Sequence, residues 1–261
     1  MTDKMLSRKD GGVGYVIFNN PERHNAVSME MWAKTRDILD QFRDDPDVRA
    51  VVLTGAGGKA FASGADISKF EAERASQAAV ERYNAAVERM YAAIYDLPKP
   101  TIAMIRGYCI GGGLGIAMSC DIRVGSEGSR FALPAAKLGL GYHYAGLKRF
   151  IDVLGPTVTK EIFYTARQYG AAEALRMGMI NHVLPDAEVE PFVMDMAETI
   201  ATNAPLTIRS VKMITQEAMK DPAERDIAKC DAAAHACFGS ADYTEGRRAF
   251  MEKRRPNFTG R

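Results

Sequence analysis

Several features that would point directly to a function are missing from this 261-residue sequence. Its four cysteines form no CxxC pair, and no histidine or acidic residue stands at a metal-ligand spacing, which predicts free thiols and no metal site. Residues 1–12 lack the apolar core of a signal peptide, and no apolar run reaches the length of a membrane span. The net charge of +1 gives no support to nucleic-acid binding. These absences predict a cytoplasmic protein that binds neither membrane nor nucleic acid.

Phosphate-binding glycine motifs are also missing, although glycines cluster at one place. Residues 111–115 hold four glycines, with no acidic residue among them. The pattern GxGxxG fails because Ile116 or Met118 stands where its last glycine would be, and the pattern GxxxxGKS or GxxxxGKT is absent. The cluster follows an apolar run and precedes a helical pattern, so backbone N–H groups are expected at a helix start. A second loop of small residues, 63–66, follows another apolar run, and the two loops could each donate one N–H to a single carbonyl oxygen. Close backbone packing is the alternative explanation for the glycines.

The hydrophobic pattern changes along the chain and predicts an α/β core followed by helices. Strands are expected at Val13–Phe18, 49–54 and Thr101–Ile105, with a short one at 131–133. Between them, apolar residues at helical spacing predict one helix that begins after Ser28 and a second one that ends before Pro98. Beyond residue 155 we expect helices only, at 157–166, 171–178, 189–203, 205–219, 222–238 and 242–253. We therefore predict a core over residues 1–195 and a C-terminal helical region over residues 196–261.

Four stretches of the sequence carry a resemblance to the crotonase (enoyl-CoA hydratase/isomerase) family. They read AFASGADI at residues 60–67, KPTIAMIRGYCIGGGLGIAMSCDIRV at 99–124, NPERHNAVS at 20–28 and FMEKRRPNF at 250–258. The resemblance implies a spiral of ββα turns, with C-terminal helices that assemble trimers or hexamers. It also implies an acyl-CoA thioester as ligand, with no cofactor beyond the coenzyme A of the substrate itself. The thioester oxygen would lie between the backbone N–H groups of Ala65 and Gly112, which would stabilise an enolate.

The resemblance also implies which other residues contact the acyl-CoA. The residues expected near the thioester and acyl group are Ser63, Asp66, Ile67, Gly111, Gly115 and Ala135. Arg23 is expected near a phosphate of the coenzyme A. Phe250 and Lys253 would close over the nucleotide, often from a neighbouring subunit, although Lys253 is also one charge in a solvated run. The side chains of Asp66 and Asp121 are expected to have structural roles.

The sequence departs from the family pattern at the two positions that handle water. Family hydratases carry glutamates where this chain has Gly115 and Ala135, and hydration needs one group to deprotonate water and another to protonate carbon. The resemblance therefore predicts enolate chemistry of a lyase or isomerase type, but not ordinary hydration. In the run LGLGYHYAGL, at 138–147, Tyr142 and His143 are the candidates for handling protons or orienting substrate. Their alternatives are a tyrosine in a pocket wall and a packing or surface histidine.

Two other functions stay open at this point. The run with Tyr142, together with KEIFYTAR at 160–167 and GMINHV at 178–183, is similar to the methylmalonyl-CoA decarboxylases of the family. Loss of CO₂ from a malonyl-type CoA needs no general base, because the oxyanion donors hold the enolate that results. The third possibility is an acyl-CoA-binding protein without catalytic activity.

Overall fold

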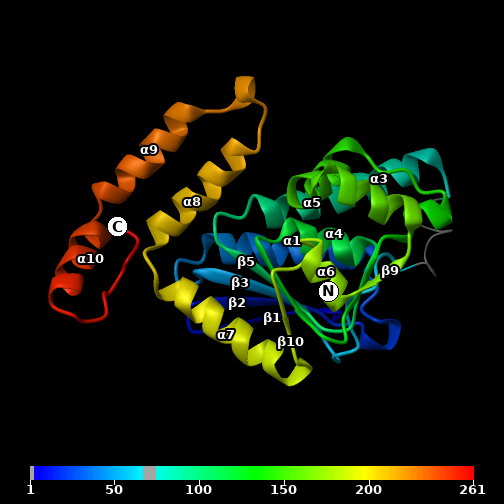
Figure 1. Cartoon of the computed structure of the whole chain (residues 1–261), viewed down its shortest axis with the longest axis horizontal. Helices are drawn as coiled ribbons and strands as arrows, with labels where there is room; N and C mark the ends of the chain where they lie inside the picture. The colour runs from blue at the N-terminus through cyan, green and yellow to red at the C-terminus, as the bar shows by residue number, and fades with distance from the viewer. Residues whose placement is uncertain (1–2, 67–74) are drawn as a thin grey trace.

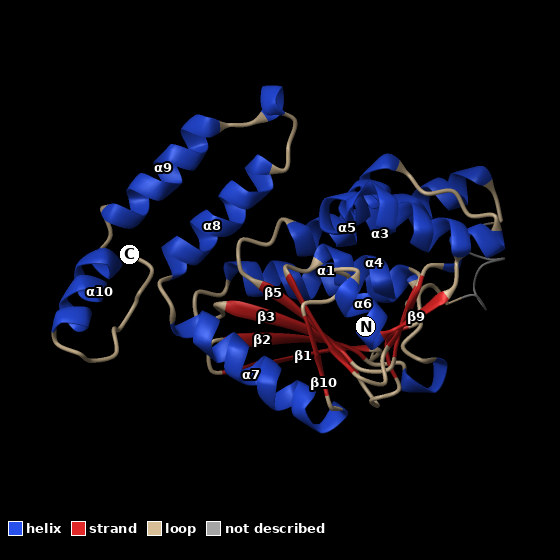
Figure 2. Ribbon diagram, viewed as in Figure 1, coloured by secondary structure: helices blue, strands red, loops and turns tan. Residues whose placement is uncertain are grey.

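A six-stranded sheet lies between helices in the α/β part of the molecule (Figure 1, Figure 2). The computed structural model describes residues 3–66 and 75–261. The strands of the sheet lie in the order β1 (Met5–Asp10), β2 (Val13–Phe18), β3 (Ala50–Gly55), β5 (Thr101–Ile105), β7 (Ile122–Ser126) and β10 (His182–Leu184). β1 pairs antiparallel with β2, and the other neighbours are parallel. Such a parallel arrangement requires crossover connections, which the helices and the short second sheet supply.

The parallel strands are buried on both faces, which explains their nearly continuous apolar sequences. In β3, Val51 and Leu53 point to one face, and Val52 points to the other. The first face packs against helices α1 (Met29–Asp44), α3 (Gln77–Tyr95) and α4 (Gly112–Ser119) in one large apolar cluster. The second face is covered by α7 (Asp186–Thr202). Two layers of helices thus enclose the sheet.

A second, smaller sheet places the loops that lead into α4. Its strands lie in the order β4 (Ala60–Ala62), β6 (Tyr108–Ile110), β8 (Arg130–Ala132) and β9 (Gln168–Gly170). β4 and β6 are parallel neighbours, so the segments that follow them leave the sheet at the same edge. The loop 63–66 and the glycines at 111–113 are these two segments, and they therefore meet in space.

The remaining helices complete the molecule. They are η1 (Pro21–Arg23), η3 (Pro134–Leu138), α5 (Tyr144–Thr165), α6 (Ala171–Arg176), α8 (Pro205–Ala218), η4 (Pro222–Glu224), α9 (Ile227–Phe238) and α10 (Ala241–Met251). α3 and α5 lie beside each other above the sheet, whereas α8, α9 and α10 extend away from it as a C-terminal arm (Figure 1). None of the described helices is both long and apolar enough to cross a bilayer.

The α/β class and the C-terminal helices agree with the sequence-based expectations. The N-cap at Ser28 is confirmed, because its side chain accepts a hydrogen bond from Met31 N at 3.4 Å. The predicted segment 157–166 is the second half of α5, which is kinked at Gly155, where φ is +73°. α7 crosses the proposed boundary at residue 195 and packs on the sheet through Ala201. We therefore propose that the C-terminal region begins after Thr202.

Two expectations for the C-terminal half were wrong. Helices are not the only elements after residue 155, because β9 joins the small sheet and β10 joins the large one. Each of these strands has three residues, which is too short to show an alternating pattern in the sequence. The segment 222–238 is also not one helix, since η4 ends at Glu224 and α9 begins at Ile227.

Candidate active site

Two loops of small residues lie against each other at the N-terminal end of α4. A Cβ atom on Gly64 would lie 3.3 Å from the backbone nitrogen of Gly112, and one on Gly113 would lie 2.0 Å from the carbonyl oxygen of Ala62. Gly64 and Gly111 have φ angles of +94° and +55°, which favour glycine. Both the close approach and the backbone conformation therefore require the glycines that the sequence places here.

The contact between the loops leaves one N–H group available on each. The Val27 N–H donates to the carbonyl of Gly64 at 2.8 Å, and the Asp66 N–H donates to the carbonyl of Val27 at 3.1 Å. Among the described residues, no protein acceptor takes the N–H of Ala65, which lies between them, or that of Gly112, the first residue of α4. The N-terminal N–H groups of a helix carry a partial positive charge. These two N–H groups are therefore suited to hold a negatively charged oxygen.

Both loops open into a cavity of about 560 Å³, which is within the usual range for a small-molecule site. The predicted site residues that line it are Ser63, Ala65, Gly111, Gly112, Ala135, Tyr142 and His143. Its far walls come from α3, from η3 and from the start of α5. The fold thus brings the two loops and the 138–147 segment, which are far apart in sequence, around one space.

Gly115 does not line the cavity, because Tyr91 stands beside it. A Cβ atom on Gly115 would lie 2.4 Å from the phenol oxygen of Tyr91, so no larger side chain fits there unless the tyrosine moves. The Tyr91 hydroxyl donates to the carbonyl oxygen of Gly112 at 3.0 Å. Burial raises the pKa of Tyr91 well above its ordinary value, so the phenol stays neutral. Tyr91 therefore connects α3 to the first residue of α4.

Tyr142 and His143 directly precede α5. One packs against a later turn of α5, and the other contacts α3. The Tyr142 ring packs edge-on against Phe163, with 4.9 Å between ring centroids. The His143 Nε2 atom is 3.2 Å from the side-chain nitrogen of Asn84 on α3. Both side chains are exposed to solvent as well as to the cavity. Their position suits groups that exchange protons with solvent or contact a bound ligand.

The sequence analysis missed the contribution of α3 to this cavity. Asn84, Glu88 and Tyr91 all line it, and they recur every three or four residues on one side of the helix. Glu88 forms an ion pair with Arg149 of α5, with an N···O distance of 2.5 Å. The polar residues beside the apolar face of this helix could have indicated a second exposed or cavity-lining face, whereas the apolar spacing indicated only the helix itself.

Three of the predicted residues, Arg23, Ser63 and Asp66, are connected beside the two loops through contacts of Arg23. Arg23 Nη1 lies 3.3 Å from Oδ1 of Asp66, which is buried. The Ser63 hydroxyl donates to the carbonyl of Arg23 at 3.3 Å. Asp66 thus contacts a guanidinium group, and the structural role expected for its side chain stays a prediction. Ile67 lies outside the described residues.

Phe250 and Lys253 are at the other end of the chain. Phe250 belongs to α10, on the C-terminal arm, and lines a different cavity between α8, α9 and α10. Neither residue contributes to the lining of the cavity at the two loops. The part of the chain that the structure describes also contains no group of three or more metal-ligating residues.

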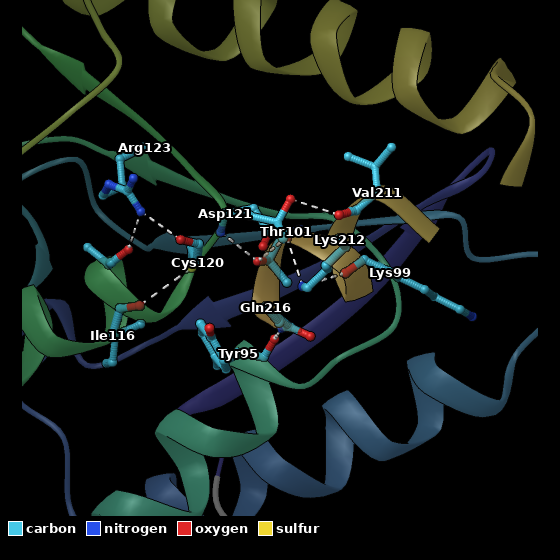
Figure 3. A network of polar contacts seen from close by, with 12 residues as sticks. Tyr95, Lys99, Thr101, Ile116, Cys120, Asp121, Arg123, Val211, Lys212 and Gln216 are labelled. Atoms are coloured by element: carbon cyan, nitrogen blue, oxygen red, sulfur yellow. Dashed lines mark hydrogen bonds and ion pairs between the residues drawn. The ribbon is translucent and has the colours of Figure 1, made fainter. Parts of the chain in front are cut away.

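The far end of α4 is anchored by a polar network (Figure 3). Arg123 is buried and donates to the carbonyl oxygens of Cys120 at 2.6 Å and Ala117 at 3.3 Å. Asp121 accepts hydrogen bonds from the Thr101 backbone N–H at 2.7 Å and from Lys212 of α8 at 2.8 Å. The expected structural role of Asp121 agrees with these contacts. Both ends of α4 are therefore held in place, one by Tyr91 and the other by this network.

Comparison with known proteins identifies the family. A family model described as enoyl-CoA hydratase/isomerase matches residues 8–261. The crotonyl-CoA hydratase of Syntrophomonas wolfei is 31% identical over 98% of this chain and 98% of its own length. A putative enoyl-CoA hydratase of Thermus thermophilus is 35% identical over 97% of this chain and all of its own length. The crystal structure of an enoyl-CoA hydratase/carnithine racemase from Magnetospirillum magneticum superposes with a TM-score of 0.95, at 32% identity, over 100% of this chain and 97% of that one. The chain therefore belongs to the enoyl-CoA hydratase/isomerase, or crotonase, family and has its fold.

Proposed function

We propose that this protein is an enzyme that acts on an acyl-CoA thioester through an enolate. The observation that carries the proposal is a pair of backbone N–H groups, on Ala65 and Gly112, that line one cavity and have no acceptor among the described residues. Placed on either side of the thioester oxygen, they stabilise the charge that develops there when the neighbouring carbon loses a proton or a carboxylate. The names of the relatives, crotonyl-CoA hydratase and putative enoyl-CoA hydratase, support acyl-CoA as the ligand. Coenzyme A is part of the substrate, and the proposal needs no other cofactor.

Ordinary hydration of a double bond is not part of this proposal. Hydration needs two groups that transfer protons. Ala135 has no such group, and Tyr91 fills the space beside Gly115. Glu88 is the one carboxylate among the described residues that line the cavity. We infer a reaction that needs fewer proton-transferring groups than hydration, in which Tyr142 and His143 orient the acyl group or exchange protons at the cavity mouth.

Decarboxylation of a malonyl-type CoA is the second candidate. Tyr83, Tyr91 and Tyr142 line the cavity, and phenols are neutral donors that can orient a carboxylate. The Glu88 carboxylate argues against decarboxylation, because it would repel the carboxylate of a malonyl-type substrate.

Incubation with crotonyl-CoA, but-3-enoyl-CoA and methylmalonyl-CoA distinguishes the reactions, when chromatography separates the isomeric enoyl-CoAs and mass spectrometry follows gain of water or loss of CO₂. We expect conversion of but-3-enoyl-CoA to its isomer and no gain of water on crotonyl-CoA. Gain of water would contradict the argument from Gly115 and Ala135, and loss of CO₂ would select the decarboxylase. Coenzyme A binding without any turnover would show a binding protein.

A pair of variants tests the N–H groups themselves. Gly112→Pro removes the N–H, and proline is tolerated at the first position of a helix. Gly112→Ala keeps the N–H, and its Cβ would meet only ordinary contacts, the nearest at 3.4 Å from Trp32. We expect turnover to fall about 10²–10³-fold in the proline variant, the usual effect of losing one such donor, but not in the alanine variant. Equal turnover in the proline variant and the wild type would overturn the proposed role of Gly112.

A further inference from the structure

We propose that Glu88 is the group that transfers the proton in this site, and that α3 supplies it. The inference rests on the proposed acyl-CoA function and deepens it. It assigns a single carboxylate, on an element that the sequence motifs did not indicate, to a shift of a double bond within an enoyl-CoA.

The position of Glu88 follows from the contact between α3 and α4. The Tyr91 hydroxyl touches the carbonyl of Gly112, so this turn of α3 lies directly beside the thioester donors. Glu88 is three residues earlier on the same side of the helix, about one turn or 5 Å away. Both residues line the cavity. Glu88 therefore lines the same cavity as the two N–H donors, about one helix turn from the contact between Tyr91 and Gly112.

Arg149 holds this carboxylate in place. Its guanidinium is 2.5 Å from one oxygen of Glu88, and its side chain is only 13% exposed. The same guanidinium lies over the Tyr91 ring, 5.6 Å from the ring centroid. The partner thus approaches from α5 and contacts one carboxylate oxygen, while the other accepts no hydrogen bond from any described residue.

Glu88 is the one acid among the described residues that line the cavity. The other polar side chains of this described lining include Ser63, Tyr83, Asn84, Tyr91, Tyr142 and His143. His143 is held by Asn84 at the exposed end. A double-bond shift needs only one base, because the group that removes the proton can return it.

The proposed step balances without a co-reactant. The Glu88 carboxylate removes a proton from the α-carbon of a β,γ-unsaturated acyl-CoA, and the electrons of that C–H bond form a new double bond to the thioester carbon. The thioester oxygen becomes an enolate oxygen held by Ala65 and Gly112. The protonated Glu88 then returns the proton to the γ-carbon, the thioester carbonyl re-forms, and the α,β-unsaturated product results.

Proton exchange in D₂O tests this assignment. The probe is but-3-enoyl-CoA, and the readouts are its conversion to crotonyl-CoA and the deuterium gained by substrate and product. We expect Glu88→Gln to lower both rates at least about 100-fold, within the usual effect of a general base. It should leave the Kd for coenzyme A and the thermal unfolding temperature near the wild-type values, because glutamine can still bond to Arg149. Glu81→Gln, on the exposed side of α3, is the matched control and should keep full activity.

The outcomes separate this proposal from the proposed function. If the wild type isomerises the probe and Glu88→Gln does so at the same rate, Glu88 is not the base, although the acyl-CoA function stands. If the wild type neither turns over nor binds any of the acyl-CoA probes, the proposed function itself fails. If Glu88→Gln unfolds, Arg149→Lys provides the second test, since a displaced carboxylate should lower kcat while the Kd for coenzyme A is kept. Unchanged kcat in Arg149→Lys together with wild-type exchange would overturn the assignment.

Discussion

At the scale of single residues, the packing of Tyr91 decides what position 115 can hold. The phenol occupies the space where a side chain on Gly115 would begin, and its hydroxyl bonds to the carbonyl of Gly112. The two residues therefore act as a pair, since a larger residue at 115 requires a smaller one at 91. This pairing links the absence of a carboxylate on α4 to the presence of an aromatic ring on α3.

The variant Gly115→Ala tests this packing. Alanine normally stabilises the interior of a helix by about 1 kcal/mol relative to glycine. Here we expect it to lower the free energy of unfolding by about 1–3 kcal/mol, as overpacking does, measured by urea denaturation. In a Tyr91→Leu background, the same change should become neutral or stabilising. Gly128→Ala is the control, because a Cβ there meets nothing within 4 Å. A more stable Gly115→Ala protein would show that Tyr91 moves away easily.

At the scale of elements, the sequence predicted some strands and missed others: β1 and β7, with six and five residues, were not predicted, whereas the three-residue β8 overlaps the strand expected at 131–133. β2, β3 and β5 were found because five or six consecutive residues carry a β pattern. β4, β6, β9 and β10 have three residues each, and their pairing with distant strands determines their conformation. The same limit applied to the site. The two loops could be predicted from their glycines, but the contribution of α3 depends on how this helix packs over α4.

The turn between α8 and α9 is held by one carboxylate, which predicts a response to acid. Glu217 accepts hydrogen bonds from Lys220 at 2.8 Å and from the Asp226 N–H at 3.2 Å, and it pairs with Lys229. These contacts lower the pKa of Glu217 from 4.5 to about 2 in the folded protein. A lowered pKa stabilises the folded state above pH 4.5, and this contribution is lost as the pH falls toward 2.

We therefore expect the free energy of unfolding to fall between about pH 4.5 and pH 2, partly because of this group. Glu217→Gln should make that fall smaller, as measured by urea unfolding at a series of pH values. It should also increase hydrogen exchange at the start of α9 at neutral pH. Glu224→Gln, an exposed neighbour in η4, is the control and should follow the wild type. Identical pH profiles for Glu217→Gln and the wild type would refute this role.

At the scale of the whole molecule, large apolar side chains are exposed on the C-terminal arm. Phe238 is 64% exposed, Phe250 is 83% exposed and Met251 is 81% exposed, and all three lie on α9 and α10. Large exposed apolar patches generally mark contact surfaces. We propose that the arm packs against further copies of the chain, as trimers or hexamers, which would also bring Phe250 and Lys253 near the cavity of a neighbour.

Sedimentation velocity of the purified protein checks this assembly. We expect a trimer or a hexamer in the wild type, and smaller species when Phe250→Asp and Met251→Asp are combined. The dissociated variant should also bind coenzyme A more weakly, because it loses contacts from the neighbour. Tyr164→Asp, at an equally exposed residue of α5, is the control and should keep the assembly. A monomeric wild type would contradict the proposal.

The use of main-chain N–H groups for the thioester has an evolutionary consequence. Every residue except proline carries such a group, so most substitutions at Ala65 and Gly112 themselves keep both donors, whereas the neighbouring glycines are needed to place them. The walls on α3 and α5 are built from side chains, and each of these can be exchanged in a single mutational event. Related proteins can thus keep the proposed N–H donors for the thioester oxygen while their side chains change to catalyse a different reaction. We therefore expect the two loops to stay similar among related proteins and the cavity-lining side chains of α3 and α5 to differ with the reaction.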